Sequence, residues 1–399
     1  MPATLCLVAL NPTDSVTEGF LPAAAALGLR VTLLTSQPDA HRRAYTGHPA
    51  APAEIVDCAV GDFRAIIGHI DRTGPVDAVF SNSDHLQAQT ALAASYAGRP
   101  AKDWRAALRA KNKAQLRRHL TRRGVDVVWS RELLPGNGTR VADAPFPCVL
   151  KPREGVASED VVLVADDREL ELACRDVWRR TPDLPLVLEQ FLTGSLRSLE
   201  TLGDGGVPQV FGGFRTTLSP PPFFIERSMV YDPTPPVDHT RAVLAQLAAL
   251  DVGFGACHTE YVVDGDRVRL IEVNYRSVGD QCDLLLRCAS GLPLFEYILR
   301  VHLGESLPAT LPVRTDRAAR IDWPCADRDG RLLAAPPPTD DCRDGVSLVY
   351  RPLREIGDER PKTNTNRDYL GVLRAFGPDQ ATVDRASAQF LATLRWDIG

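Results

Sequence analysis

Lysine is scarce in this chain of 399 residues. Only five of its 46 basic residues are lysines, so the other 41 are arginines; the five are Lys102, Lys111, Lys113, Lys151 and Lys362. Since lysine normally ranks among the commonest residues, each position that kept one raises the question of why arginine does not stand there. The compact ammonium group of lysine and the wide planar fork of arginine are not interchangeable at an anion-binding site. The lysine positions are therefore candidate sites.

Long apolar runs and an excess of positive charge are also missing. No segment approaches the roughly 20 apolar residues of a membrane span. With a formal net charge of −5, the chain lacks the excess of basic residues that is typical of nucleic-acid-binding proteins. The opening residues, MPATLCLVALNP, carry no basic region and only a short apolar run, so they predict a strand and not a signal peptide. We expect a cytoplasmic protein with neither nucleic acid nor membrane as partner, and the sequence leaves a homodimer open.

Motifs for zinc, covalent catalysis and dinucleotides are absent as well. The nine cysteines form no CxxC pair and the eight histidines form no HxxxH or HExxH pattern, which argues against a zinc site. No Ser/His/Asp or Cys/His set stands in a motif, so covalent enzyme catalysis is not indicated. A GxGxxG motif is missing after the first strand, so dinucleotide binding is not expected there.

What the chain contains first is an alternation of strands and helices. Residues 4–10 predict a strand, 17–28 a helix, and 30–35 and 76–81 two further strands. Strand, helix and strand joined by short connections indicate a parallel sheet with both faces covered. The N-terminal part therefore has the pattern of a Rossmann-like layer. At roughly 100–200 residues per domain, the length indicates two or three domains or one large composite.

Two of the lysines stand at places where an anion could bind. Asn112 followed by Gln115 resembles a capping box and predicts a helix that starts at Lys113. A cation at that positive helix end is disfavoured unless an anion lies nearby, although a solvated surface lysine is the alternative. A buried strand at 146–150 delivers Lys151 to the start of a loop of small residues. Such a loop is either a phosphate cover built from backbone N–H groups or an ordinary hairpin loop.

The segment 255–274 predicts a hairpin with acidic residues on one face. With a three-residue loop, Glu260 lies opposite Leu270, and Glu272 and Asn274 then share its face because side chains alternate with period two. Two carboxylates and an amide oxygen suit Mg²⁺. A polar, solvent-facing hairpin is the alternative, and a two-residue loop would turn Glu272 to the other face. Against that alternative, Glu272 lies within an apolar run that should be buried.

The order of these features resembles the ATP-grasp superfamily. LIEVNYR (270–276) resembles the metal-binding strand of that family, FPCVLKP (146–152) its second ATP lysine, and LEQFLTG (188–194) its adenine hinge. The resemblance covers about residues 1–305. It implies an α/β chain (α+β in the ATP-binding part) with four parts: a Rossmann-like pre-ATP-grasp domain, a lid subdomain that closes before chemistry, a body with a metal site, and a C-terminal α+β element. Their ranges are 1–110, 111–188, 189–310 and 311–399.

The resemblance also implies a set of site residues. The residues implied to bind ATP are Lys113, Lys151, Gly155, Ser158, Glu189, Gln190, Phe191 and Leu192. One or two Mg²⁺ ions, which Mn²⁺ could replace, are implied at Glu260, Glu272 and Asn274, and Arg276 is implied to stabilise the transferred phosphoryl charge. Two departures stand out. Leu196 and Arg197 occupy the zone of the usual acidic ribose ligand, with Glu200 as a weak substitute, and Asn112 stands where the family has Asp.

The function implied is that of an ATP-dependent carboxylate–amine ligase that forms an amide through an acyl phosphate and releases ADP and phosphate. Segments 274–286 and 363–379 resemble ligases of siderophore biosynthesis. Because arginine forks suit carboxylates, the candidates for gripping a carboxylate substrate are Arg215, Arg276, Arg351 and the run 364–367. A surface arginine is the alternative for each. The alternatives are a biotin-carboxylase-like enzyme that uses bicarbonate and a non-catalytic ATP-binding protein of the same fold.

Overall fold

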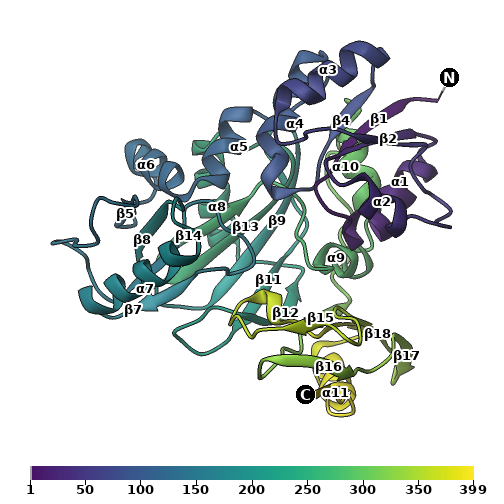
Figure 1. Ribbon diagram of the computed structural model, residues 1–399. Helices are drawn as coiled ribbons and strands as arrows, with labels where there is room; N and C mark the ends of the chain where they lie inside the picture. The colour runs from purple at the N-terminus through teal and green to yellow at the C-terminus, as the bar shows by residue number, and fades with distance from the viewer. Residues whose placement is uncertain (1) are drawn as a thin grey trace.

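The first hundred residues form a parallel sheet between two layers of helices. The computed structural model describes residues 2–399. The strand order is β3-β2-β1-β4, and β1 pairs in parallel with both neighbours (Figure 1). The bounds are β1 (Thr4–Val8), β2 (Arg30–Thr35), β3 (Glu54–Asp57) and β4 (Ala78–Phe80), with helices η1 (Ser15–Phe20), α1 (Leu21–Ala26), α2 (Pro38–Ala44), α3 (Phe63–Thr73), η2 (Asp84–Leu86) and α4 (Gln87–Tyr96). The parallel sheet predicted from the sequence is confirmed.

Strand alternation explains why this sheet is covered on both sides. Leu5 and Leu7 of β1 belong to the same buried cluster as Phe20 and as Phe295 of α10 (Leu294–His302). The intervening Cys6 and Val8 belong to a separate cluster with α3 and α4. Because successive side chains point to opposite faces, a strand that is apolar at every position must be buried on both.

A second, smaller sheet is antiparallel and carries one helix. Its strand order is β5-β8-β6-β7, and we call it the small sheet. Leu170, Cys174 and Val177 lie on one face of α7 and pack against it, and Asp166 caps that helix by accepting from the Glu169 N–H at 2.9 Å. Two short helices, α5 (Trp104–Lys111) and α6 (Lys113–Arg123), lead into it. The other bounds are β5 (Ser130–Leu133), β6 (Cys148–Pro152), β7 (Val162–Val164), α7 (Asp167–Arg180) and β8 (Leu186–Gln190).

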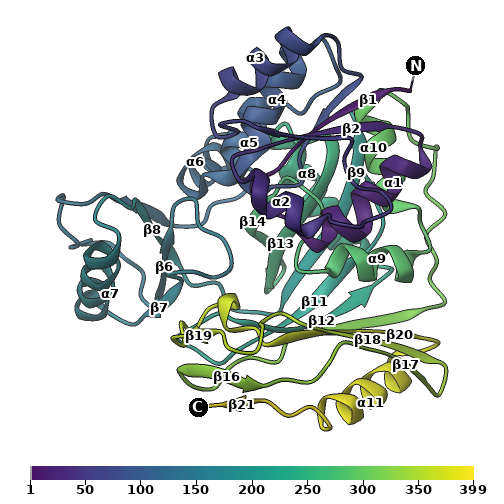
Figure 2. The same cartoon turned by 45° about the vertical axis from the view of Figure 1, so that its right-hand side comes forward.

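The remaining strands form one large sheet that continues into the C-terminal part. Its order is β14-β13-β9-β11-β12-β15-β20-β18-β17, with β10 paired to β9. Figure 2 shows the small sheet and α7 to one side of it and the C-terminal strands below. The strands are β9 (Leu196–Asp204), β10 (Gln209–Val210), β11 (Gly213–Leu218), β12 (Glu226–Asp232), β13 (Phe254–Asp264), β14 (Arg267–Asn274), β15 (Ala318–Asp322), β17 (Thr339–Arg343), β18 (Val346–Pro352) and β20 (Gly371–Gly377).

Helices cover the large sheet, and a fourth, short sheet made of the three strands that do not join the large one lies in the C-terminal part. The helices are α8 (Val237–Ala249), α9 (Cys282–Ser290), α10 and α11 (Gln380–Leu391), with the single turn η3 (Asn366–Asp368). The short sheet consists of β16 (Gly330–Ala334), β19 (Glu359–Arg360) and β21 (Asp397–Ile398). No helix within residues 2–399 is long and apolar enough to cross a membrane.

The register of the β13–β14 hairpin differs from the prediction. Asp264 pairs with Arg267, so the loop has two residues and not three. Tyr261 pairs with Leu270, but the next pair is Glu260 with Glu272, because Ile271 is an extra residue in a bulge. A bulge shifts the alternation by one residue and so returns Glu272 to the face of Glu260. The predicted loop and the predicted pairing of Glu260 with Leu270 are wrong; the shared face is confirmed, with the two carboxylates directly paired.

Candidate active site

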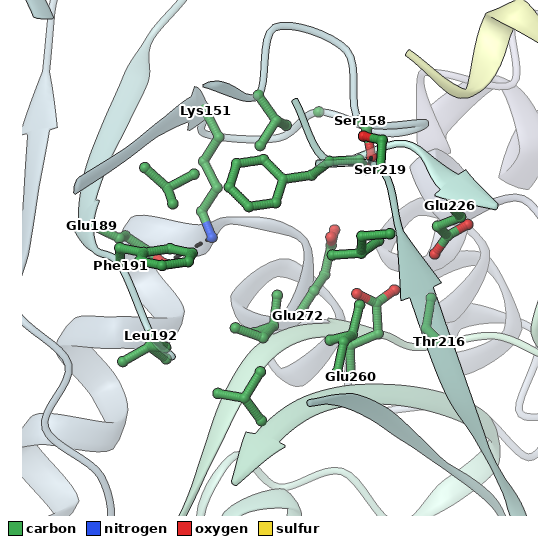
Figure 3. A pocket seen from close by; sticks show the side chains of 18 of the residues that line it. Lys151, Ser158, Glu189, Phe191, Leu192, Thr216, Ser219, Glu226, Glu260 and Glu272 are labelled. Atoms are coloured by element: carbon green, nitrogen blue, oxygen red, sulfur yellow. Dashed lines mark hydrogen bonds and ion pairs between the residues drawn. The ribbon is translucent and has the colours of Figure 1, made fainter. Parts of the chain in front are cut away.

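A cavity of about 510 Å³ lies between the small sheet and the large sheet. Its walls come from β6, β8, the loop after β6, β11 and the β13–β14 hairpin. All eight residues that the resemblance assigned to ATP line it, and so do Glu260 and Glu272. Figure 3 shows Glu260, Glu272 and Glu226 on the side opposite Lys151. The structure therefore gathers residues that lie up to 159 positions apart in the sequence around one space.

Lys151 and Glu189 form a buried ion pair on one wall. The Lys151 Nζ atom lies 2.7 Å from Glu189 Oε2 (Figure 3). Arg117 of α6 donates to both oxygens of the same carboxylate, from Nε at 3.1 Å and from Nη2 at 2.9 Å. Burial by itself would raise the pKa of Glu189, but Arg117 and Lys151 outweigh it and hold the pKa at about 2. The carboxylate predicted to receive adenine is thus already satisfied by two protein cations.

Arg117 was not among the residues predicted from the sequence. It lies four positions after Lys113 on the same helix, and residues at that spacing share a helix face. Its Nη1 atom also donates to the Leu270 carbonyl at 2.7 Å, which ties α6 to the β13–β14 hairpin. The spacing from Lys113 is the signal that could have indicated it.

Lys113 forms an ion pair with a carboxylate of the protein itself, that of Glu272. Asn112 caps α6 by accepting from the Gln115 N–H at 3.0 Å, so the predicted helix start is confirmed. The Lys113 Nζ atom donates to Glu272 Oε1 at 3.0 Å and is 5% exposed. Burial would lower the pKa of Lys113, but the Glu272 carboxylate outweighs it and raises the pKa. The solvated surface lysine, which was the alternative, is wrong.

One face of the hairpin presents hard oxygen donors. Glu260 pairs with Glu272, and His258 pairs with Asn274 two residues along, so all four share a face. Within residues 2–399 no three His, Cys, Asp or Glu side chains are placed to hold a metal by themselves. Mg²⁺ typically takes one or two carboxylates and completes its shell with waters and phosphates. The pair of carboxylates and the Asn274 amide therefore fit Mg²⁺ with a phosphate-bearing ligand, and not a closed protein cage.

Glu200 is not placed to bind a ribose. It is 1% exposed, and its Oε1 atom lies 2.7 Å from His258 Nδ1 and 2.7 Å from Ser198 Oγ. His258 Nε2 reaches Glu260 at 3.3 Å, so the imidazole bridges the two carboxylates. Burial would lower the pKa of His258, but Glu200 and Glu260 outweigh it and raise the pKa to about 10. The prediction for Glu200 is wrong; this residue anchors the histidine beside Glu260. His258 lies two residues before Glu260 on the same strand and therefore on the same face, and this spacing could have indicated it from the sequence.

Arg276 lies beside the cavity at the end of β14 and faces an aspartate. Its Nε atom lies 4.0 Å from Asp84 Oδ1, and Lys111 forms an ion pair with the same carboxylate. Lys102 donates to the backbone carbonyl of Tyr275 and, at 2.6 Å, to Gln87 Oε1. Four of the five lysines thus contact residues in or next to the candidate site. Arg276 is not one of the residues lining the cavity, and its role stays a prediction.

Arg215 and Arg351, predicted to grip a carboxylate substrate, do not line this cavity. Arg215 lines a separate shallow hollow together with Arg197. Arg351 pairs with Asp340 at 2.6 Å between β17 and β18. Their role in substrate binding stays a prediction.

The buried Glu189 carboxylate predicts an acid-sensitive contribution to stability. Its folded pKa of about 2 lies below its ordinary value of 4.5, so it stabilises the fold above pH 4.5, and this contribution is lost as the pH falls through 2. Glu189→Gln should unfold more easily than the wild type at pH 7, and the difference should shrink between pH 4.5 and 2. Urea unfolding at a series of pH values measures it, with the exposed Glu359→Gln as control. A constant difference across this range would contradict the assignment.

Three features define the fold of the chain. They are the parallel N-terminal sheet, the small antiparallel sheet, and the cavity between the small and large sheets. The chain has the ATP-grasp fold, which confirms the fold predicted from the sequence. No family model matches the chain.

Two solved structures that share this fold are the following. The crystal structure of L-amino acid ligase from Bacillus licheniformis superposes with a TM-score of 0.82 and 20% identity, over 100% of this chain and 99% of that one. The biotin carboxylase domain dimer of Hydrogenobacter thermophilus 2-oxoglutarate carboxylase, in complex with MgADP, ADP and bicarbonate, gives a TM-score of 0.70 and 16% identity, over 99% and 90%.

Two relatives are similar in sequence. The protein y4rH of Sinorhizobium fredii, called uncharacterized, is 27% identical over 416 residues, which cover 98% of this chain and 83% of that protein. The carbamoyl phosphate synthase large chain of Rubrobacter xylanophilus is 27% identical over 170 residues, which cover 41% of this chain and only 16% of that protein.

Proposed function

We propose that the chain is an ATP-dependent carboxylate–amine ligase that forms an amide through an acyl phosphate. The observation that carries this proposal is the arrangement of one cavity: two buried lysines, Lys113 and Lys151, and the carboxylate pair Glu260 and Glu272 converge on it beneath a small-residue loop. Ammonium groups bind the phosphates of a nucleotide, and the carboxylates suit a divalent cation that neutralises phosphoryl charge. The L-amino acid ligase fold, which matches over the whole chain, supports the same reaction class.

In this proposal the residues around the cavity have separate roles in binding and in the reaction. Lys113 and Lys151 hold the triphosphate, and Lys113 then exchanges its bond to Glu272 for one to a phosphate oxygen. The backbone of Gln190 to Leu192 and the apolar walls hold the base. Arg276 approaches the carboxylate substrate and stabilises charge on the phosphoryl group. The loop at 154–161 excludes water, which would otherwise hydrolyse the acyl phosphate.

The metal belongs to Glu260, Glu272 and Asn274 in this proposal. A bound Mg²⁺ supplies charge neutralisation for phosphoryl transfer, and Mn²⁺ has the same preference for oxygen ligands. His258, held by Glu200, keeps the Glu260 carboxylate turned toward the cavity.

The domain division that we propose keeps the four ranges predicted from the sequence. The assembly that we propose is a homodimer, since the Hydrogenobacter domain is described as a dimer.

We further propose a secondary-metabolite pathway, such as siderophore or peptide formation, as the setting. The support for it is the resemblance of segments 274–286 and 363–379. A biotin-carboxylase-like use of bicarbonate is the second candidate, because the Hydrogenobacter domain shares the fold over 99% of this chain.

A screen of carboxylate and amine pairs for ADP release tests the proposal. We expect ADP release that depends on both a carboxylate and an amine, and a hydroxamate when hydroxylamine replaces the amine, because hydroxylamine traps acyl phosphates. ADP release stimulated by bicarbonate with a biotinyl acceptor would favour the second candidate. If ATP raises the melting temperature and no pair gives turnover, the chain is a non-catalytic nucleotide-binding protein.

A further inference from the structure

The loop at residues 363–368, TNTNRD, extends from the C-terminal part of the chain to the loop that covers the cavity. It is organised around Asp368, whose side chain is fully buried. This carboxylate accepts from the Thr363 N–H at 2.9 Å, from the Thr363 hydroxyl at 2.9 Å and from the Asn364 N–H at 2.7 Å. The loop therefore holds its shape by its own hydrogen bonds and presents Asn366 and Arg367 outward from a fixed frame. We call it the TNTNRD loop.

Asn366 uses its backbone and its side chain to hold two separate parts of the site. Its N–H donates to the Ala157 carbonyl at 3.1 Å. Its Nδ2 atom donates to Glu226 Oε2 at 3.1 Å, and its Oδ1 atom accepts from the Glu226 N–H at 3.2 Å. Glu226 lines the cavity next to Glu260 (Figure 3). Both ends of the amide are engaged, so its orientation is determined, and one residue joins the cover loop to a carboxylate of the site.

The cover loop, residues 154–161, needs outside support. Ala157, Ser158 and Asp160 have φ angles of 57°, 54° and 55°, a left-handed conformation that is strained for residues other than glycine. Such strain persists only where surrounding contacts hold it. Besides Asn366, the supports include the Ser158 hydroxyl, which donates to the Phe224 carbonyl at 2.8 Å, and the ion pair of Glu159 with Arg367 at 2.7 Å. Asp160 pairs with Arg180 at 2.7 Å, and Asn112 donates to Glu154 at 2.8 Å.

The contact between the TNTNRD loop and the small-sheet region is narrow. A hollow of about 620 Å³ remains between α7, the cover loop and residues 362–367. The Arg367–Glu159 pair is exposed, at 60% and 45% of the two side chains, and exposed pairs contribute little. Asn366, which is 9% exposed, is therefore the stronger of the two connections.

We propose that Asn366 is a positioning residue: it holds the cover loop closed over the cavity and fixes Glu226 beside Glu260, so that the C-terminal part controls closure of the site. Opening of the cover loop breaks the bond from the Asn366 N–H to Ala157 and the Arg367–Glu159 pair, whereas loss of the Asn366 side chain leaves Glu226 with freedom to turn. The consequence for turnover rests on the proposed function. The consequence for loop closure does not depend on it.

Hydrogen exchange of the full chain, without any nucleotide, tests closure directly. Asn366→Pro removes the N–H that donates to Ala157, and proline fits the first residue of the turn η3. It should raise amide exchange in residues 155–161 several-fold while exchange in the parallel N-terminal sheet stays at the wild-type rate. Asn366→Ala keeps that N–H and loses only the bonds to Glu226, so it should raise the exchange less. Asn137→Ala, a substitution at an exposed asparagine outside these contacts, is the matched control. Unchanged exchange at 155–161 in Asn366→Pro, in a protein that is folded, would overturn the proposal.

A second measurement separates positioning from a general loss of stability. Dissociation of a fluorescent ADP analogue should be about 5- to 10-fold faster in Asn366→Pro, the loss expected from one or two hydrogen bonds. If Asn366→Pro does not fold, the double variant Asn366→Ala with Arg367→Ala replaces it, because it removes the bonds to Glu226 and the ion pair with Glu159. With an active substrate pair, kcat should fall more than KM rises. Faster exchange without turnover by any pair would leave the closure role intact and defeat only the proposed ligase.

Discussion

Replacing Glu272 by glutamine is expected to lower turnover by more than about 100-fold while the protein stays folded. The carboxylate has two predicted duties, as a metal ligand and as the partner of Lys113 at 3.0 Å. The amide keeps the shape but loses the charge, and loss of a ligand should exceed the roughly 10- to 100-fold effect of residues that only support ligands. The side chain is 21% exposed, so its substitution should disturb the core little.

ADP release and the melting temperature, measured on the same preparation, test this expectation. Glu359→Gln is the matched control, since Glu359 lies exposed in the short C-terminal sheet. Binding of Mn²⁺ with ADP, followed by electron paramagnetic resonance, should weaken in Glu272→Gln and not in the control. Turnover like that of the wild type in Glu272→Gln would refute the metal assignment.

Replacing Arg117 by leucine is expected to destabilise the fold by about 3–5 kcal/mol, the range for removing one partner of a buried ion pair. Arg117 is 2% exposed and satisfies both oxygens of Glu189. Without it, the carboxylate stays buried with Lys151 alone, and the Leu270 carbonyl loses its donor. The midpoint of urea unfolding should fall accordingly.

Arg118→Leu, one position along the same helix, is the control, because its partner Glu132 and its own side chain are more exposed. The double variant Arg117→Leu with Glu189→Leu should be less stable than the single one, because it leaves Lys151 buried without its partner. A single variant as stable as the control would show that the pair of Arg117 with Glu189 contributes nothing. A double variant as stable as the single one would show the same for the pair of Lys151 with Glu189.

Local rules predicted several elements correctly. The Asn112 cap fixed the start of α6, and the apolar strand at 146–150 delivered Lys151 to the cavity. These succeed because caps, proline and strand alternation act within a few residues. The prediction of the hairpin loop and its register failed for the opposite reason. Nothing local marks Ile271 as a bulge, and its effect depends on packing of β13 against both β14 and β9.

Residues that act through distant partners escaped sequence analysis. Glu226 and Asn366 are 140 positions apart and meet only because β12 and β20 flank β15 in one sheet. Arg215 looked suitable as a carboxylate ligand, yet it lines a hollow separate from the cavity. Composition and spacing carry no information on which face of a long sheet closes the site.

The sequence by itself determined the order of the elements, the ATP-grasp resemblance and the importance of two lysines in a chain that has only five. Only the tertiary structure decided what each charge faces: Lys113 faces Glu272, Lys151 and Arg117 share Glu189, and Glu200 lies behind His258. The physical reason is burial. A charged group removed from water must be matched by partners, and those partners are set by packing of segments far apart in the chain.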